Sequence, residues 1–190
     1  MSSGFHRYWR PILAMLVLIA ASNWLVQFPI EAGHVLGFPL LITWGAFTYP
    51  ASFLVTDLTN RRHGPVVARR VIYVGFAVGV VLSAVLATPR IAFASGTAFL
   101  VAQLLDVFVF NWLRRQAWWR APLFASLLGS VVDTAVFFSI AFVGTTVPWG
   151  LLAASDLFVK LLYALFALIP YRIYMALVRP VWAEPVAVRP

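Results

Sequence analysis

Six long apolar runs limit what this chain can fold into, and short connections that hold most of the charged residues separate them. Each run has roughly the 20 apolar residues that an α-helix needs to cross a ~30 Å hydrocarbon layer. A transmembrane barrel would instead need alternating polar and apolar residues. The sequence therefore predicts an all-α, polytopic membrane protein with one six-helix domain over residues 1–190. The expected transmembrane helices lie at about 11–30, 37–59, 66–88, 91–113, 121–143 and 150–178.

Charged residues make up only 11% of the 190 residues, whereas hydrophobic residues make up 63%. A soluble domain carries roughly 25% charged residues. The chain has too few charges to cover a surface that faces water, which excludes a soluble enzyme and a nucleic-acid-binding module despite the net charge of +8. The expected partner is the lipid bilayer rather than nucleic acid. Cysteine is absent, so disulfides and thiolate metal sites are excluded.

The arginines outside the apolar runs predict the orientation of the chain. Twelve of them fall on alternate connections and at the termini, which places them on one side of the membrane, and Arg90 alone falls on the other side. Positive charge is enriched on the cytoplasmic side, so both termini are expected in the cytoplasm. The twelve are Arg7, Arg10, Arg61, Arg62, Arg69, Arg70, Arg114, Arg115, Arg120, Arg172, Arg179 and Arg189.

Four of the six acidic residues fall within the apolar runs or at their ends: Asp57, Asp106, Asp133 and Asp156. A carboxylate at the bilayer centre costs about 2.5–3.5 kcal/mol on insertion scales, so each is expected to face the bundle interior, to pair with a base or to bind a ligand. Lys160 follows Asp156 by four residues in the last run. This spacing leaves two interpretations open, a local ion pair and a ligand site.

Helical spacing groups other polar and aromatic side chains with these carboxylates and predicts a polar, ligand-filled centre. The groups are Asn23 with Gln27, Trp44 with Phe47 and Thr48, Gln103 with Asp106, Ser126 with Ser130 and Asp133, and Asp156 with Lys160 and Tyr163. Plainer roles also fit some of them: the amides as hydrogen bonds between helices, the serines as small-residue packing, and the aromatics as core.

A ligand class follows from these side chains. A carboxylate can accept two parallel N–H bonds from a guanine-type edge, amides or lysine can donate to a ring carbonyl, and aromatic rings can stack on the ring face. A flat, uncharged heterocycle fits this set well, although an amino acid or a short peptide is not excluded.

The segment from Asp57 to Arg70 closes the second run and opens the third, and it has two interpretations. Its arginines can serve as positive-inside charge around a turn at Gly64-Pro65. Alternatively, Asp57 can pair with an arginine of this loop in one conformation and release it in another, which would make a cytoplasmic latch.

Catalytic and metal-binding motifs are missing from the sequence. It has no P-loop, no H-E-x-x-H and no G-x-S-x-G. Two intramembrane aspartates can suggest an aspartyl protease, but the Gly-x-Gly-Asp motif is absent. The chain is therefore expected to be a transport or binding protein and not an enzyme, without catalytic residues, metal or cofactor.

A series of short motifs resembles the queuosine precursor transporter family over most of the chain. Each motif is weak alone, but their order is specific. The first third carries Asn23-Trp-Leu-Val-Gln27 with Pro29, Thr43-Trp-Gly-Ala-Phe47, Thr56-Asp-Leu-Thr59, Gly64 and Ala68-Arg-Arg70. The remainder carries Arg90-Ile-Ala, Gln103-x-x-Asp106, Phe110-Asn111, Trp118-Trp119, Ala121-Pro122, Asp133-Thr134, and Asp156 with Lys160 and Pro170.

The resemblance implies a six-helix carrier of the bacterial inner membrane that imports 7-cyano-7-deazaguanine and 7-aminomethyl-7-deazaguanine for tRNA modification. It also implies kinship with the substrate-binding subunits of energy-coupling-factor vitamin transporters, although its members work without the ATPase module. The alternative is a binding subunit that needs a partner ATPase. A thin six-helix bundle also suggests a homodimer.

Site residues carried over by position fall into two groups. The substrate-binding candidates are Asn23, Gln27, Trp44, Phe47, Gln103, Asp106, Asp133, Asp156 and Lys160, and the gating candidates are Asp57, Arg69 and Arg70. In the ligand pose that we expect, Asp133 or Asp156 reads the N1–H and 2-amino edge. Gln103 or Asn23 then contacts the carbonyl, and Trp44 or Phe47 stacks on the ring.

Overall fold

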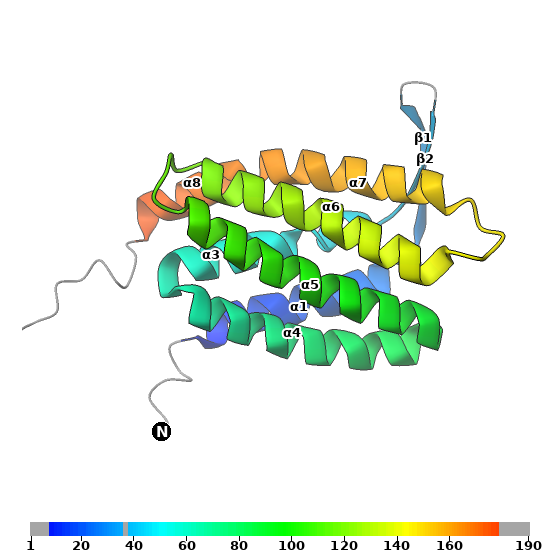
Figure 1. The fold of residues 1–190 in the computed structure, drawn as a ribbon, viewed down its shortest axis with the longest axis horizontal. Coiled ribbons are helices and arrows are strands. Elements are labelled where there is room, and N and C mark those ends of the chain that lie inside the picture. Colours follow the sequence, from blue (N-terminus) through cyan, green and yellow to red (C-terminus); the bar gives the residue numbers. More distant parts are fainter. Residues whose placement is uncertain (1–7, 36–37, 179–190) are drawn as a thin grey trace, which may run out of the picture.

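The structure is a computed structural model that describes residues 8–35 and 38–178. Arg7, Arg179 and Arg189, which contribute to the predicted orientation, lie outside these residues. Helices dominate the described part, with one small hairpin (Figure 1). The elements are α1 (Trp9–Leu25), β1 (Pro29–Val35), β2 (Phe38–Thr43), α2 (Gly45–Thr48), α3 (Ala51–His63), α4 (Pro65–Leu86), α5 (Pro89–Leu113), α6 (Arg120–Phe142), α7 (Trp149–Phe166) and α8 (Leu168–Leu177).

Four helical stretches of the described chain are long and apolar enough to cross a membrane. They are α4, α5, α6, and α7 continued by α8 as Trp149–Leu177. α1 is also apolar but shorter, with 17 residues, or about 26 Å of helix. The prediction of a mainly helical, multi-pass membrane protein is confirmed at this level.

The second expected transmembrane helix, 37–59, is not one helix. Its first part is strand β2, which pairs antiparallel with β1 so that Pro29 lies opposite Thr43. The short α2 follows, and α3 begins only after Pro50. Prolines have no N–H to donate and break helical hydrogen bonding, so Pro39 and Pro50 explain why this apolar run cannot form a continuous helix.

The turn between α3 and α4 matches the expectation. Gly64 has a φ of +85°, a conformation that favours glycine, and Pro65 occupies the first turn of α4. The turn therefore reverses the chain in a single residue and sets α3 and α4 side by side.

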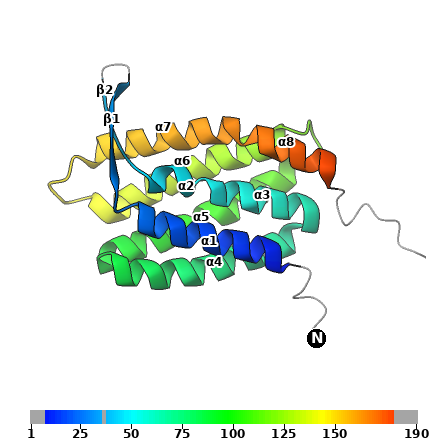
Figure 2. The ribbon, with the colours of Figure 1, turned by 180° about the vertical axis from the view of Figure 1, so that it is seen from behind.

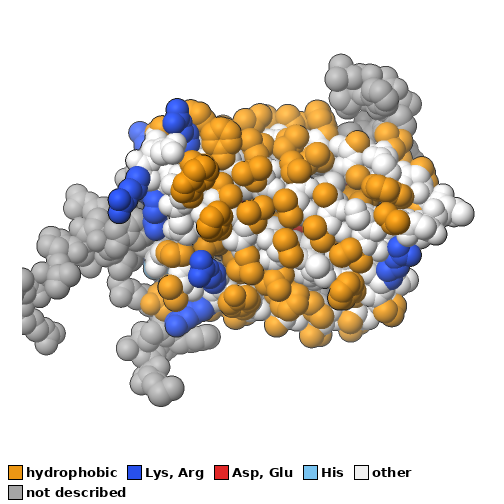
Figure 3. Space-filling model, in the orientation of Figure 1, with side chains coloured by type: hydrophobic (Ala, Val, Ile, Leu, Met, Phe, Trp, Pro, Cys, Tyr) orange, Lys and Arg blue, Asp and Glu red, His pale blue; other side chains and the backbone are white. Residues whose placement is uncertain are grey.

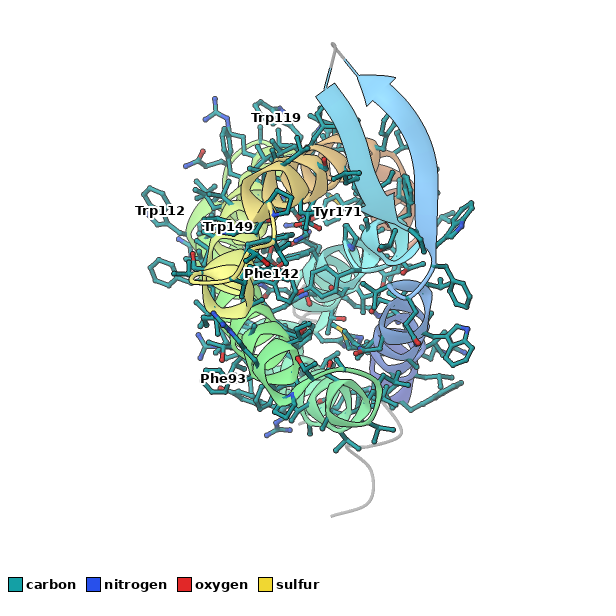
Figure 4. All side chains as sticks on the ribbon, turned by 90° about the vertical axis from the view of Figure 1, so that its right-hand side faces the viewer. Phe93, Trp112, Trp119, Phe142, Trp149 and Tyr171 are labelled. Atoms are coloured by element: carbon teal, nitrogen blue, oxygen red, sulfur yellow. The ribbon has the colours of Figure 1, made fainter. Side chains whose placement is uncertain are left out.

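The helices surround an interior that α3 helps to fill. α4 packs on α1 and α5, α6 packs on α5 and α7, and α3 contacts α1, α4, α5, α6 and α8. Figure 2 shows α1 and α3 on the face opposite to α6, and the end-on view of Figure 4 shows the helices arranged around the centre. In that view Trp112 points away from the bundle, in keeping with its 75% exposure.

The outer surface between the two ends is largely apolar. In Figure 3 hydrophobic side chains cover the middle of the visible face, and Lys and Arg side chains gather towards its ends. The α3–α4 turn and the α5–α6 connection lie at one end, whereas the hairpin and the α6–α7 connection lie at the other (Figure 1). An apolar belt with charged rims is the surface that a lipid bilayer requires.

Candidate binding site

A buried ion cluster joins α6 to α7. The Lys160 Nζ atom donates to Asp133 Oδ2 at 2.6 Å, to Thr134 Oγ1 at 3.1 Å and to Asp156 Oδ2. The side chains of Lys160 and Asp133 are only 5% and 4% exposed. The local pair expected between Asp156 and Lys160 is therefore present, and it also includes Asp133, whose own helix carries no base within the membrane.

The two carboxylates differ in what they leave available. Both oxygens of Asp133 are occupied, because Oδ1 accepts from the Tyr49 hydroxyl at 2.6 Å and Oδ2 accepts from Lys160. In Asp156, Oδ2 accepts from Lys160 and from the Thr134 hydroxyl. The described residues give Asp156 Oδ1 no hydrogen bond, and the Asp156 side chain is 21% exposed. Asp156 thus has a carboxylate oxygen free to accept from a ligand.

This cluster forms part of the wall of a cavity of about 170 Å³. The wall is mixed, with polar side chains from α1, β2 and α4 to α7, and aromatic rings from α4, α5, α6 and the link between α2 and α3. Its polar and charged members are Ser22, Asn23, Thr43, Ser83, Ser95, Asp133, Asp156 and Lys160, and its aromatic members are Tyr49, Phe76, Phe99 and Phe137. Mostly apolar walls with a few placed polar groups are typical of small-molecule sites.

The irregular segment between β2 and α3 lies at this cavity. Thr43, Gly45, Ala46 and Tyr49 all line it. Non-helical backbone at membrane depth is tolerated where protein buries it or where it lines a cavity, and discontinuous segments of this kind form binding sites in transporters. The interruption of the second apolar run therefore lies at the same cavity as the ion cluster.

Four of the predicted substrate-binding residues meet at the cavity: Asn23, Asp133, Asp156 and Lys160. Asn23 Oδ1 accepts from Ser83 Oγ at 2.7 Å, and its Nδ2 donates to the Ile19 carbonyl at 2.9 Å. The amide thus also links α1 to α4, the helix-to-helix role that the sequence left open.

The other predicted substrate-binding residues lie elsewhere. Gln27 is exposed, and Trp44 and Phe47 are 54% and 45% exposed, with their rings on the outside of the bundle. Gln103 and Asp106 are fully buried but do not line the cavity. The expected inward face over Trp44, Phe47 and Thr48 assumes a continuous helix, and the break before α3 turns different side chains inwards.

Sequence reasoning missed the aromatic wall and two hydrogen-bonding partners. Tyr49, Phe99 and Phe137 line the cavity, and Thr134 bridges Lys160 and Asp156. Thr134 follows Asp133 in the motif Asp133-Thr134, so its hydroxyl could have been predicted as a partner of the intramembrane charges. The rings gave no such signal, because the chain has 16 phenylalanines and 6 tyrosines.

A second polar layer lies beside the cavity, between α3 and α5. Gln103 Nε2 donates to Ser52 Oγ at 2.8 Å, and Gln103 Oε1 accepts from the Thr56 hydroxyl at 2.6 Å. All three side chains are buried. Gln103 therefore has its two ends engaged by α3 and fixes the position of that half-length helix.

The proposed gate residues are separate in this conformation. Asp57 is 2% exposed and accepts from Ser126 Oγ at 3.2 Å, whereas Arg69 and Arg70 are exposed on α4. No hydrogen bond or ion pair of the described chain joins Asp57 to either arginine.

An apolar belt, an interrupted apolar segment and a cavity lined by a buried ion cluster together indicate a membrane transport or binding protein. The family model described as "Putative vitamin uptake transporter" matches residues 43–88 and 82–175. A protein of Haemophilus influenzae named "Probable queuosine precursor transporter" is 37% identical over 188 residues, which cover 82% of this chain and 80% of the relative.

The "Queuosine precursor transporter" of Escherichia coli is 40% identical over 156 residues, which cover 71% of this chain and 68% of the relative. No solved structure matches the chain significantly. The chain belongs to the queuosine precursor transporter family, as the motif series in its sequence indicated.

Proposed function

We propose that this protein imports queuosine precursors, the 7-deazaguanine bases 7-cyano-7-deazaguanine and 7-aminomethyl-7-deazaguanine, for tRNA modification. The names and identities of the two relatives support the substrate class. The observation that carries the proposal is Asp156, which lines an aromatic-walled cavity and whose Oδ1 accepts no hydrogen bond from the part of the chain that the structure describes.

The cavity chemistry fits one edge of such a base. The N1–H and 2-amino groups of a 7-deazaguanine are donors, and Asp156 Oδ1 is an acceptor. Tyr49, Phe99 and Phe137 offer rings against which a flat base can lie. Asn23 lines the cavity, and its amide can donate to the ring carbonyl. The amide of Gln103 cannot take this role, because it is bonded to Ser52 and Thr56 of α3.

We further propose six membrane-crossing segments, with β2, α2 and α3 together forming the second, and both termini in the cytoplasm. The α3–α4 turn and the α5–α6 connection carry Arg61, Arg62, Arg114, Arg115 and Arg120 at one end of the bundle (Figure 1). The cavity takes residues from the end of α1 and the start of α7, so it lies nearer the opposite end. This arrangement corresponds to a carrier whose binding site lies towards the outer face of the inner membrane.

The proposed binding site is compatible with two alternative modes of transport. A stand-alone carrier moves the base without an ATPase, whereas a binding subunit needs a partner to release it. We favour the stand-alone carrier, because the family resemblance implies transport without that module, and we propose a homodimer as its assembly. Light scattering of the detergent-solubilised protein tests the dimer.

Calorimetry with the purified protein is the first experiment. We expect saturable binding of 7-cyano-7-deazaguanine that guanine displaces poorly. Uptake of the same base into liposomes that contain only this protein then follows, with chemically unchanged base recovered inside. Absence of binding to folded protein would contradict the proposal, uptake only with added ATPase subunits would favour the binding subunit, and an altered product would indicate an enzyme.

A further inference from the structure

A second pair of acidic side chains lies apart from the cavity, where α3 meets α5. Asp57 is 2% exposed and Asp106 is 0% exposed. The Thr56–Gln103 hydrogen bond at 2.6 Å joins α3 to α5 beside them, and the two carboxyl groups interact as neighbours at this contact. Neither residue lines the cavity. The pair is therefore a distinct feature of the interior, which we call the aspartate pair.

The aspartate pair has fewer hydrogen bonds than two carboxylates need. Ser126 Oγ donates to Asp57 Oδ2 at 3.2 Å. Asp57 Oδ1 and both oxygens of Asp106 accept no hydrogen bond from the residues of 8–35 and 38–178. The side-chain amide of Asn60, one turn further along α3, is also fully buried without a partner. Buried acceptors that lack donors are costly, so something else must satisfy these oxygens.

The surroundings of the pair offer little compensating charge. α6 contributes the Ser126 hydroxyl, α8 contributes the phenol of Tyr171, and the buried side chains of α4 at this level are apolar. Arg61 on α3 and Arg114 after α5 lie near Tyr171, and Arg114 donates to Asn111 Oδ1 and to the Asn60 carbonyl. Lys160, the base within the membrane, is engaged by Asp133 and Asp156.

In the described part of the chain, two neighbouring buried carboxylates with a single donor between them and no base beside them are too costly to remain ionised together. A single proton shared between the two carboxyl groups replaces their electrostatic repulsion with an O–H···O hydrogen bond. This bond gives a partner to two of the oxygens that otherwise lack one. We propose that Asp57 and Asp106 share one exchangeable proton and that this pair couples import to the proton gradient. This inference rests on the proposed function as an importer.

The position of the pair suits that role. Ser52, Thr56, Asp57 and Asn60 follow one another along α3, from the cavity end towards the arginine-rich end. Gln103, which bonds Ser52 and Thr56, precedes Asp106 on α5 by three residues. Polar side chains of α3 and α5 therefore lie on the cavity side of the pair, and in this proposal the proton enters from the outer side and leaves to the cytoplasm.

The test uses liposomes that contain the purified protein and labelled 7-cyano-7-deazaguanine. With acid outside and alkali inside, we expect the wild type to accumulate the base, up to about tenfold per pH unit for one proton per base. Asp106→Asn, which mimics the protonated carboxyl in shape, is expected to bind the base normally and to exchange it across the membrane, but to lose accumulation driven by the gradient. Asp57→Asn is expected to behave in the same way.

A matched control is Thr59→Val on α3, because the Thr59 hydroxyl donates to the Val55 carbonyl of its own helix. This variant should respond to the gradient as the wild type does. Infrared spectroscopy of the wild type gives a second readout that needs no transport. A carboxylic-acid C=O band that disappears in Asp106→Asn or in Asp57→Asn would support the shared proton, even if one of the two variants does not fold.

Several outcomes would overturn the inference while leaving the importer intact. They are wild-type uptake that ignores the pH gradient, accumulation driven by a sodium gradient instead, gradient-driven accumulation that survives in both variants, and the absence of the infrared band. Failure of the wild type to bind or take up the base would instead overturn the proposed function itself.

Discussion

Lys160 has its ammonium group engaged by three acceptors, and this arrangement determines how the residues around it act. It neutralises one of two neighbouring carboxylates, so the cluster carries a net charge of −1 when all three groups are ionised. Asp133 is a structural member, held by Tyr49 and Lys160, whereas Asp156 keeps an oxygen towards the cavity. Changes at the two carboxylates should therefore have different effects.

Asp156→Asn is expected to weaken binding of 7-cyano-7-deazaguanine by about 10- to 100-fold, because a hydrogen bond to a charged group contributes roughly 1.5–3 kcal/mol. The variant should remain folded, since Lys160 keeps Asp133 as its partner. Calorimetry measures the change, and Thr59→Val serves as the unaffected control. An affinity within a factor of about two of the wild type would exclude Asp156 as the ligand's acceptor.

Lys160→Met is expected to lower the stability of the bundle by about 3–5 kcal/mol, since it leaves Asp133 and Asp156 buried without a base. The measurement is thermal or denaturant unfolding in detergent. Adding Asp133→Asn and Asp156→Asn to the same chain should restore part of the loss. Equal stability of Lys160→Met and wild type would show that the cluster is not held by charge.

At the scale of elements, the irregular segment from β1 to α3 is held by specific contacts rather than by helix packing alone. The Trp44 N–H donates to the Phe28 carbonyl at 3.1 Å and extends the hairpin ladder. The Leu41 N–H donates to Ser155 Oγ at 3.3 Å, which ties β2 to α7. Gly45 sits against the backbone of Val26 so closely that an added Cβ would lie 2.9 Å from it.

Gly45→Ala is therefore expected to destabilise the protein by about 1–3 kcal/mol, because overpacking against backbone cannot be relieved by a rotamer change. Gly150→Ala is the matched control, since nothing lies within 4 Å of its added Cβ at the exposed start of α7. Unfolding of both variants in detergent should separate them. A loss in Gly150→Ala as large as that in Gly45→Ala would contradict the close approach.

The sequence predicted the regular elements better than the irregular ones, for a physical reason. Hydropathy reports apolar length, so the runs that became α4, α5 and α6 were recognised, as was the turn at Gly64-Pro65. Hydropathy does not report backbone hydrogen bonding. Residues 37–59 were therefore predicted as one helix, although Pro39 and Pro50 interrupt it. For the site, Asp133, Asp156 and Lys160 were found because charge in an apolar run is costly. Tyr49 depends on the break and was missed.

At the scale of the whole molecule, an apolar belt separates two unlike ends. One end carries the arginines of the α3–α4 turn and the α5–α6 connection. The other end carries the hairpin and the α6–α7 connection (Figure 1), and the start of α5 with Arg90 contacts the end of α6 there. The Arg90 side chain is fixed at this end by two hydrogen bonds, which it donates to the carbonyls of Ile140 and Val143 at 2.8 and 2.5 Å. The asymmetry predicts which end faces the cytoplasm.

The natural chain contains no cysteine, so single cysteines can report this orientation without background. Ala117→Cys in the α5–α6 connection and Thr146→Cys in the α6–α7 connection are both exposed positions. In cells with a permeabilised outer membrane, we expect a membrane-impermeant thiol reagent to label Thr146→Cys and to spare Ala117→Cys until the inner membrane is opened. The reverse pattern would invert the topology, and the cysteine-free wild type gives the blank.

The half-length helix α3 also has a consequence for how the protein is made. Within 13 residues it carries Asp57, Asn60, Arg61 and Arg62, and each charge near a helix centre costs about 2.5–3.5 kcal/mol during insertion at the translocon. Such a segment cannot partition into lipid by itself as it emerges from the ribosome. Ser52 and Thr56 bond to Gln103 of α5, and Asp57 accepts from Ser126 of α6, and both of these helices are synthesised later. α3 would therefore wait at the membrane surface or in the translocon until those helices arrive, and nascent chains truncated before α6 should leave it outside the bilayer.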